Sequence, residues 1–95
     1  MNVSSLNSRI IHGDTSISVG QIGPGDYSYF KIPIAAPDGY EIMGMVFTAN
    51  YSPHLSISWT EQADDPGNAW IVIKNNYSSA LTPEEISVRK WFYKS

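Results

Sequence analysis

The fold is decided by the stretch His54-Leu55-Ser56-Ile57-Ser58-Trp59-Thr60, in which polar and apolar residues alternate without interruption. Side chains of a β-strand point alternately to opposite faces, so a period of two predicts a strand with one apolar and one polar face. Leu55, Ile57 and Trp59 are therefore expected to face a core. The Ser and Thr hydroxyls are expected to lie on the other face.

The same period extends to residues 27–34. This run places Phe30, Ile32 and Ile34 on one face and Tyr29 and Lys31 on the other. Pro33 has no amide hydrogen to donate to a neighbouring strand, so this segment is expected to be an edge strand or to end early.

Further short strands are predicted between turns that contain Gly, Pro, Asn and Asp. They comprise residues 10–12, 15–19, 40–49, 70–74 and 86–93. Gly13-Asp14 is a two-residue hairpin signal between the first two. Thr82-Pro83-Glu84-Glu85 has the residues of a helix start, but no helical period follows, so we interpret it as a turn. About six to seven short strands predict an all-β, antiparallel β-sandwich, with a small barrel as the alternative.

The strand predicted at residues 40–49 is apolar on both faces. Such a strand is expected at the centre of a sheet or at a contact between subunits. Residues 1–12 are interpreted as a lead-in segment and residues 13–95 as the domain. Val3, Leu6 and Ile10 have heptad spacing, which could end a coiled coil. The Ser and Asn residues around them favour a non-helical lead-in.

Composition excludes several classes of protein. The 95 residues include no Cys, which excludes disulfides, thiolate zinc sites and a Cys nucleophile. Six Lys and Arg against nine Asp and Glu give a net charge of −3, without the basic face that nucleic-acid binding needs. No signal sequence or membrane-spanning run is recognisable, so we expect a soluble chain without membrane insertion.

Catalytic and metal-binding patterns are weak. His12 and His54 are the only histidines, and neither lies in a nucleophile motif, although a hydrolase that pairs His54 with a carboxylate is an open alternative. The pairs Asp64-Asp65 and Glu84-Glu85 are interpreted as solvated turn charges. Asp64, Asp65 and Asn68 lack the spacing of a calcium loop. We therefore expect no enzyme activity, no metal and no cofactor.

Aromatic residues are the most informative feature, with three Trp, six Tyr and three Phe. Tyr in polar loops beside Asn and Ser can stack on a sugar and hydrogen-bond to it, or dock on a protein. The candidate ligand-binding residues are Tyr51, His54, Trp70, Asn75, Asn76 and Tyr77.

Residues 15–94 resemble the small all-β C-terminal domains of tail and fibre proteins from phages and prophages of Gram-positive bacteria. Four segments carry the resemblance, in order and spacing. They are Tyr27-Ser28-Tyr29-Phe30-Lys31-Ile32, Pro37-Asp38-Gly39-Tyr40-Glu41-Ile42-Met43-Gly44, Trp70-Ile71-Val72-Ile73-Lys74-Asn75-Asn76-Tyr77-Ser78-Ser79 and Ile86-Ser87-Val88-Arg89-Lys90-Trp91-Phe92-Tyr93. The layout is also similar to H-type lectin domains, but the last strand has Arg89-Lys90 before Trp91, and no sugar-binding triad can be matched.

The resemblance implies a β-sandwich that forms a trimer in the virion tail or in a prophage-encoded structural protein. Its role would be to cap a fibre and attach it to the host surface, with a bacterial cell-surface glycan or wall polymer as partner. A stand-alone carbohydrate-binding, lectin-like module is the alternative.

Overall fold

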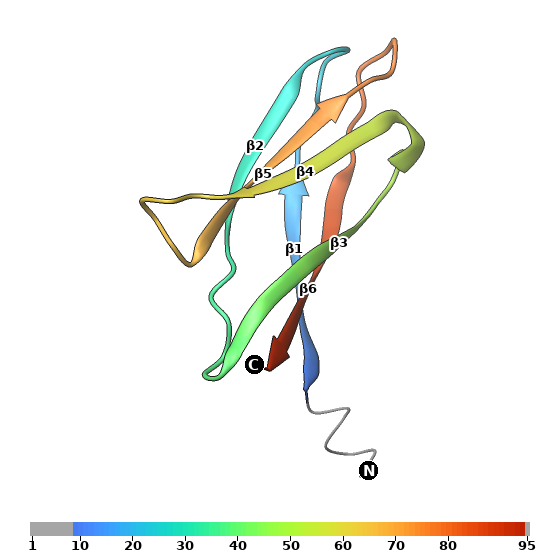
Figure 1. Cartoon of the computed structure of the whole chain (residues 1–95). Coiled ribbons are helices and arrows are strands. Elements are labelled where there is room, and N and C mark those ends of the chain that lie inside the picture. Colours follow the sequence, from blue (N-terminus) through green and yellow to red (C-terminus); the bar gives the residue numbers. More distant parts are fainter. Residues whose placement is uncertain (1–8, 95) are drawn as a thin grey trace.

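The computed structural model describes residues 9–94 and contains six strands and one 3-10 helix in this range. The strands are β1 (Ile10–Val19), β2 (Tyr27–Pro33), β3 (Tyr40–Ala49), β4 (Leu55–Glu61), β5 (Asn68–Asn75) and β6 (Glu84–Lys94), and the helix is η1 (Ser52–His54) (Figure 1). No helix in the described range has the length and apolar character to cross a membrane.

The strands form two three-stranded antiparallel sheets, in the orders β1-β6-β3 and β2-β5-β4. Figure 1 shows β4 crossing in front of β5, with β3 and β6 in the other sheet. The two sheets pack against each other around one core. The antiparallel β-sandwich predicted from the alternation is confirmed, and its six strands lie within the expected number.

The core is built mainly on the two central strands. Ile71 and Ile73 of β5 and Ile86 of β6 have no exposed surface, and Val88 is 1% exposed. Burying one such aliphatic side chain stabilises a fold by about 1.5–3 kcal/mol. By contrast, no residue of β3 or β4 is fully buried. The sandwich is therefore tightly packed at its centre and only partly covered along these two edges.

The faces predicted for β2 and β4 are confirmed. Ile32 and Ile34 are buried and Phe30 packs against them, whereas Tyr29 and Lys31 are exposed. Pro33 is the last residue of β2, which is an edge strand as expected. On β4 the three apolar residues of the deciding stretch pack against the core.

The hairpin predicted at Gly13-Asp14 is wrong. β1 continues through both residues, because Gly13 pairs with Lys90 and Asp14 with Arg89 in the long strand β6. Residues 10–12 pair with residues 91–93, so they belong to the sheet rather than to a lead-in. The predicted domain boundary between residues 12 and 13 thus falls inside a strand. Val3 and Leu6 of the heptad pattern lie outside the described residues.

A central position for the strand apolar on both faces is also wrong, because β3 is an edge strand. Its pairing with β6 shifts between Ile42 and Gly44, where Met43 forms a β-bulge. Met43 and Val46 are each 54% exposed. An edge position leaves these apolar side chains uncovered in the single chain.

Residues 82–85 form no helix, as predicted, but the predicted turn is shorter than expected, because Glu84 and Glu85 already pair with β1 as the first residues of β6. The amide of Glu85 donates to the carbonyl oxygen of Pro83 (2.8 Å), and Glu84 between them has a positive φ of 69°. A left-handed residue closed by this short hydrogen bond forms a γ-turn, which starts the strand and cannot start a helix.

Candidate functional site

The outer face of the β2-β5-β4 sheet carries three of the exposed aromatic side chains, those of Tyr27, Tyr29 and Trp70. Antiparallel register places the outward residues in three rows across the sheet. These rows are Tyr27, Lys74 and Ser56; Tyr29, Val72 and Ser58; and Lys31, Trp70 and Thr60. We call this set the outer platform.

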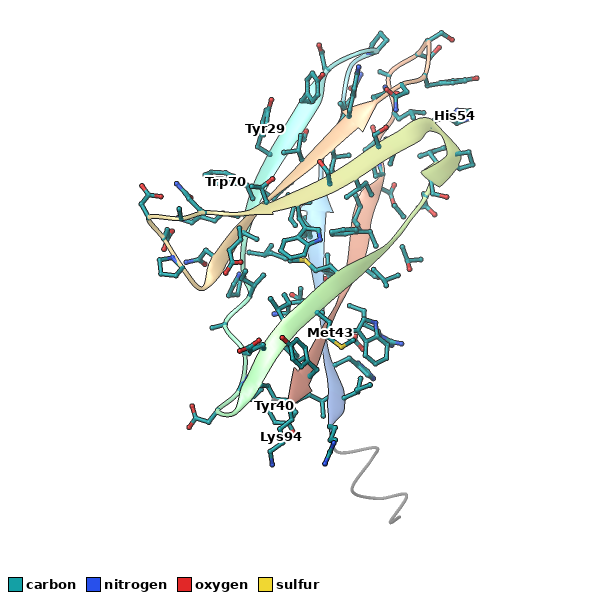
Figure 2. All side chains as sticks on the ribbon, in the orientation of Figure 1. Tyr29, Tyr40, Met43, His54, Trp70 and Lys94 are labelled. Atoms are coloured by element: carbon teal, nitrogen blue, oxygen red, sulfur yellow. The ribbon has the colours of Figure 1, made fainter. Side chains whose placement is uncertain are left out.

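Aromatic rings cover the β2 side of the outer platform. Tyr27 is 51% exposed, Tyr29 61% and Trp70 39%. The rings of Tyr27 and Tyr29 are nearly parallel, with centroids 6.2 Å apart and an interplanar angle of 21°. Tyr29 and Trp70 lie near each other beside β2 and β5, whereas His54 lies at the other end of β4 (Figure 2). The platform thus presents several open ring faces on one surface.

Polar contacts hold these rings in place. The indole Nε1 of Trp70 donates to Oε1 of Gln62 (2.8 Å), and the ammonium of Lys31 lies 5.9 Å from the indole ring. The ammonium of Lys74 lies 5.5 Å from the centroid of Tyr27. Cation–π contacts at exposed sites are worth about 0.5–1 kcal/mol. Rings that are already held lose less conformational entropy when a ligand binds.

Lys31 also forms an ion pair with Asp65. Hydrogen bonding from Lys31, and then from Asn68, lowers the pKa of the Asp65 carboxyl group. Asn68 Nδ2 donates to Asp65 Oδ1 at 3.1 Å. These contacts occupy two of the three residues considered as calcium ligands. No group of three His, Asp or Glu that could hold a metal ion occurs within residues 9–94.

Hydroxyl groups cover the β4 side of the outer platform. Ser56, Ser58 and Thr60 are all exposed and point to the same side as the aromatic rings. The platform therefore combines open ring faces with a row of hydroxyls. Flat aromatic surface beside hydrogen-bonding groups matches the apolar C–H faces and hydroxyl edges of sugars.

A second group of candidate residues adjoins this row where β5 ends. The rings of His54 and Tyr77 lie 4.3 Å apart between centroids, at an angle of 39°. The Asn76 amide N–H donates to the His54 carbonyl oxygen (2.8 Å), and its side-chain Nδ2 donates to Ser56 Oγ (2.6 Å). His54, Asn76 and Tyr77 thus extend the surface of the platform beyond Lys74.

Asn75 has a different place from its neighbours, because it is fully buried. Its Nδ2 donates to the carbonyl oxygens of Ile22 (3.0 Å) and Ser79 (2.9 Å), and its Oδ1 accepts from the amide of Tyr77 (2.8 Å). These bonds fix the loop that presents Asn76 and Tyr77. The Asn75 side chain therefore supports the surface from below, and no part of it is open to a ligand.

Tyr51 precedes η1 in a left-handed conformation, with φ 62° and ψ 25°. Non-glycine residues occur rarely in this region, and a bulky side chain there is unusual. Its side chain is exposed, and its carbonyl oxygen accepts from the amide of His54 (2.8 Å). Tyr51 thus lies one helical turn from the contact between His54 and Tyr77.

The structure brings five of the six predicted site residues to one end of the β2-β5-β4 sheet. Trp70 lies towards the other end of β5, about 17 Å away at the usual rise per strand residue. Between these two ends, Tyr27 and Tyr29 of β2 lie beside β5, and neither was among the predicted site residues. Their phase opposite Ile32 could have indicated them, but only the pairing of β2 with β5 places them beside Trp70.

The outer face of the other sheet has a different character. Its exposed large apolar residues are Ile10, Met43, Val46 and Tyr93, three of them aliphatic or thioether side chains. Asp14 lies among the polar residues of this face, where its carboxylate accepts from Arg89 Nε (2.8 Å) and Nη2 (3.2 Å). His12 and Trp91 also face this side, with ring centroids 4.9 Å apart. Most of the large exposed side chains here are nevertheless aliphatic or thioether groups, so this face suits contact with protein better than contact with sugar.

Comparison of the chain with models of protein families and with curated proteins finds no match.

Proposed function

We propose that this domain is a non-catalytic attachment module that binds a polysaccharide through the outer platform. The observation that supports it is the composition of this one face. It carries the exposed rings of Tyr27, Tyr29 and Trp70 beside the hydroxyls of β4. Sugar rings would stack on the aromatic side, and their hydroxyls would hydrogen-bond to Ser58 and its neighbours on β4.

An open platform suits a polymer better than a small molecule. Small molecules are usually bound in concave pockets that cover most of their surface. The outward positions from Trp70 to Asn76 instead extend about 20 Å along the strand direction. A long glycan chain could use this whole length, with a modest contribution from each contact.

The proposed biological setting is the end of a phage or prophage tail fibre, where the module attaches to the host surface. The resemblance of residues 15–94 to such domains supports this setting. We further propose that the domain acts as a trimer. Three weak sites on one rigid head can raise the overall affinity by about 10²–10⁴ through effective concentration alone. The partner would then be a bacterial cell-surface glycan or wall polymer.

The test is binding of the purified domain to host cells and to polysaccharide extracted from their walls. Trp70→Ala and Tyr29→Ala should each weaken binding about tenfold, which corresponds to about 1.4 kcal/mol, the scale of one aromatic stacking contact. Tyr93→Ala, on the opposite sheet, is the matched control. It is compared on short oligosaccharides from the wall polymer, where association of subunits adds no affinity, and it should bind them normally. Equal binding by all three variants would refute the platform as the site.

A stand-alone lectin-like module is the second candidate, and it would use the same platform. It differs in having no need for a fibre or a trimer. A purified chain that sediments as a monomer and still binds simple sugars would favour it. The hydrolase alternative has less support, because the described contacts of the His54 side chain are with the Tyr77 ring and include no carboxylate.

A further inference from the structure

The charges of the outer platform have the opposite sign to those of the whole chain. The chain has a net charge of −3. The three outward rows of the platform nevertheless contain Lys31 and Lys74 and no Asp or Glu. The nearest acidic residue before β2, Asp26, places its carboxylate against Gly23 in the preceding loop. The rows themselves therefore carry no carboxylate, and the Asp65 carboxylate pairs with Lys31, at one end of the platform.

The two lysines are not equivalent. Lys31 is paired with Asp65 at the edge of the platform, so most of its charge is already balanced. Lys74 lies on the central strand β5 and forms no ion pair within residues 9–94. It is held over the ring of Tyr27, which keeps its ammonium on the platform. Its charge is therefore available to a ligand.

A hydrogen-bond donor lies directly beside Lys74. Ser56 is opposite Lys74 in the register of β4 and β5. The Ser56 oxygen already accepts from Asn76 Nδ2, so its own hydroxyl hydrogen is free to point elsewhere. An ammonium and a hydroxyl donor together can bind the oxygens of one anionic group, and hydrogen bonds to charged groups are the stronger ones.

We infer that the bound polysaccharide is anionic and carries carboxylate or phosphate groups along its chain. This inference rests on the proposed function of the outer platform. One anionic group contacts Lys74 and Ser56, while the adjoining sugar units stack on Tyr27 and Tyr29. Because the rest of the protein is acidic, the attraction acts only at short range, and salt weakens it.

The test uses the full chain with three soluble polymers of similar length: polygalacturonate, polyglycerol phosphate and neutral dextran. Affinity is measured by titration calorimetry at low and at physiological salt. At least one anionic polymer should bind about fivefold or more tightly than dextran at low salt, and this preference should shrink as salt is added. Comparison of the carboxylate and phosphate polymers identifies which anionic group is recognised.

Lys74→Gln should remove the preference, so that the ratio of the affinities for the anionic polymer and for dextran falls to about one, since Gln keeps much of the side-chain length without the charge. Lys94→Gln is the matched control, because Lys94 lies at the far end of the other sheet (Figure 2). Equal affinity for neutral and anionic polymers, unaffected by Lys74→Gln, would overturn this inference and leave the proposed function standing. Absence of binding to all three polymers and to host wall polysaccharide would overturn both.

Discussion

Asn75 and Asn76, adjacent at the end of β5, have different roles. Asn75 is buried and bonds to three backbone groups, whereas the Asn76 side chain is exposed and bonds to Ser56. Residue type alone does not tell the two apart, but the alternation of β5 does, since Asn75 shares the phase of Ile71 and Ile73. The difference arises because the outward phase of β5 continues through Asn76, while Asn75 faces the core.

Asn75→Ala should therefore lower the free energy of unfolding by about 1–3 kcal/mol, because it leaves buried backbone groups without partners. Asn76→Ala is the matched control and should change stability by less than about 0.5 kcal/mol. Urea unfolding followed by tryptophan fluorescence measures both. The assignment of Asn75 to a supporting role would be wrong if the two variants lost similar stability.

The ion pair between Asp14 and Arg89 makes the stability of the fold depend on pH. Hydrogen bonding from Arg89, on the neighbouring strand, holds the pKa of the Asp14 carboxyl group below the ordinary value of 3.8. A pKa that is lower in the folded state than in the unfolded state stabilises the fold above the unfolded value. This contribution is lost as the pH falls through the folded value.

We expect the melting temperature of the wild type to fall more steeply than that of Asp14→Asn as the pH is lowered from about 5 to about 3. The contribution is small because the pair is exposed to solvent. Asp38→Asn, in the turn before β3, controls for loss of one negative charge and should keep the wild-type slope. Parallel curves for the wild type and Asp14→Asn would show that the pair with Arg89 does not stabilise the fold.

The alternation of polar and apolar residues predicted correctly which faces of β2 and β4 are buried. It could not predict which strands pair with each other. The apolar face of β4 followed directly from its period of two. Gly13-Asp14 has the local signal of a hairpin, yet its residues pair with β6, more than seventy positions later, which holds β1 straight. The same limit applies to the site. Trp70 could be chosen from its residue type, but the outer platform around it exists only because β2 pairs with β5.

For the molecule as a whole, the exposed edge strand β3 is the feature that favours association of subunits. Exposed edges with apolar side chains invite association, and proteins often protect them with Pro, Lys or a bulge. β3 contains neither Pro nor Lys, and the bulge at Met43 is its visible protection. Nearby Ile10 and Val46 leave further apolar surface uncovered on the same face. This face is therefore our candidate for burial between subunits.

If the domain acts as a trimer, its two outer faces divide the work: the outer platform binds the polymer, and the face of β1, β6 and β3 joins the subunits. Val46→Lys should then convert the trimer to a monomer, measured by sedimentation velocity. The monomer should bind short oligosaccharides normally and lose about 10²-fold or more of its affinity for whole cells.

Ser18→Lys, at the polar end of the same sheet, is the matched control and should remain trimeric. A wild-type chain that sediments as a monomer at all concentrations would exclude this division of work. Attachment would then depend on the single outer platform, and Val46→Lys would leave binding to cells unchanged. The two measurements together therefore separate a module that gains affinity by assembly from one that binds alone.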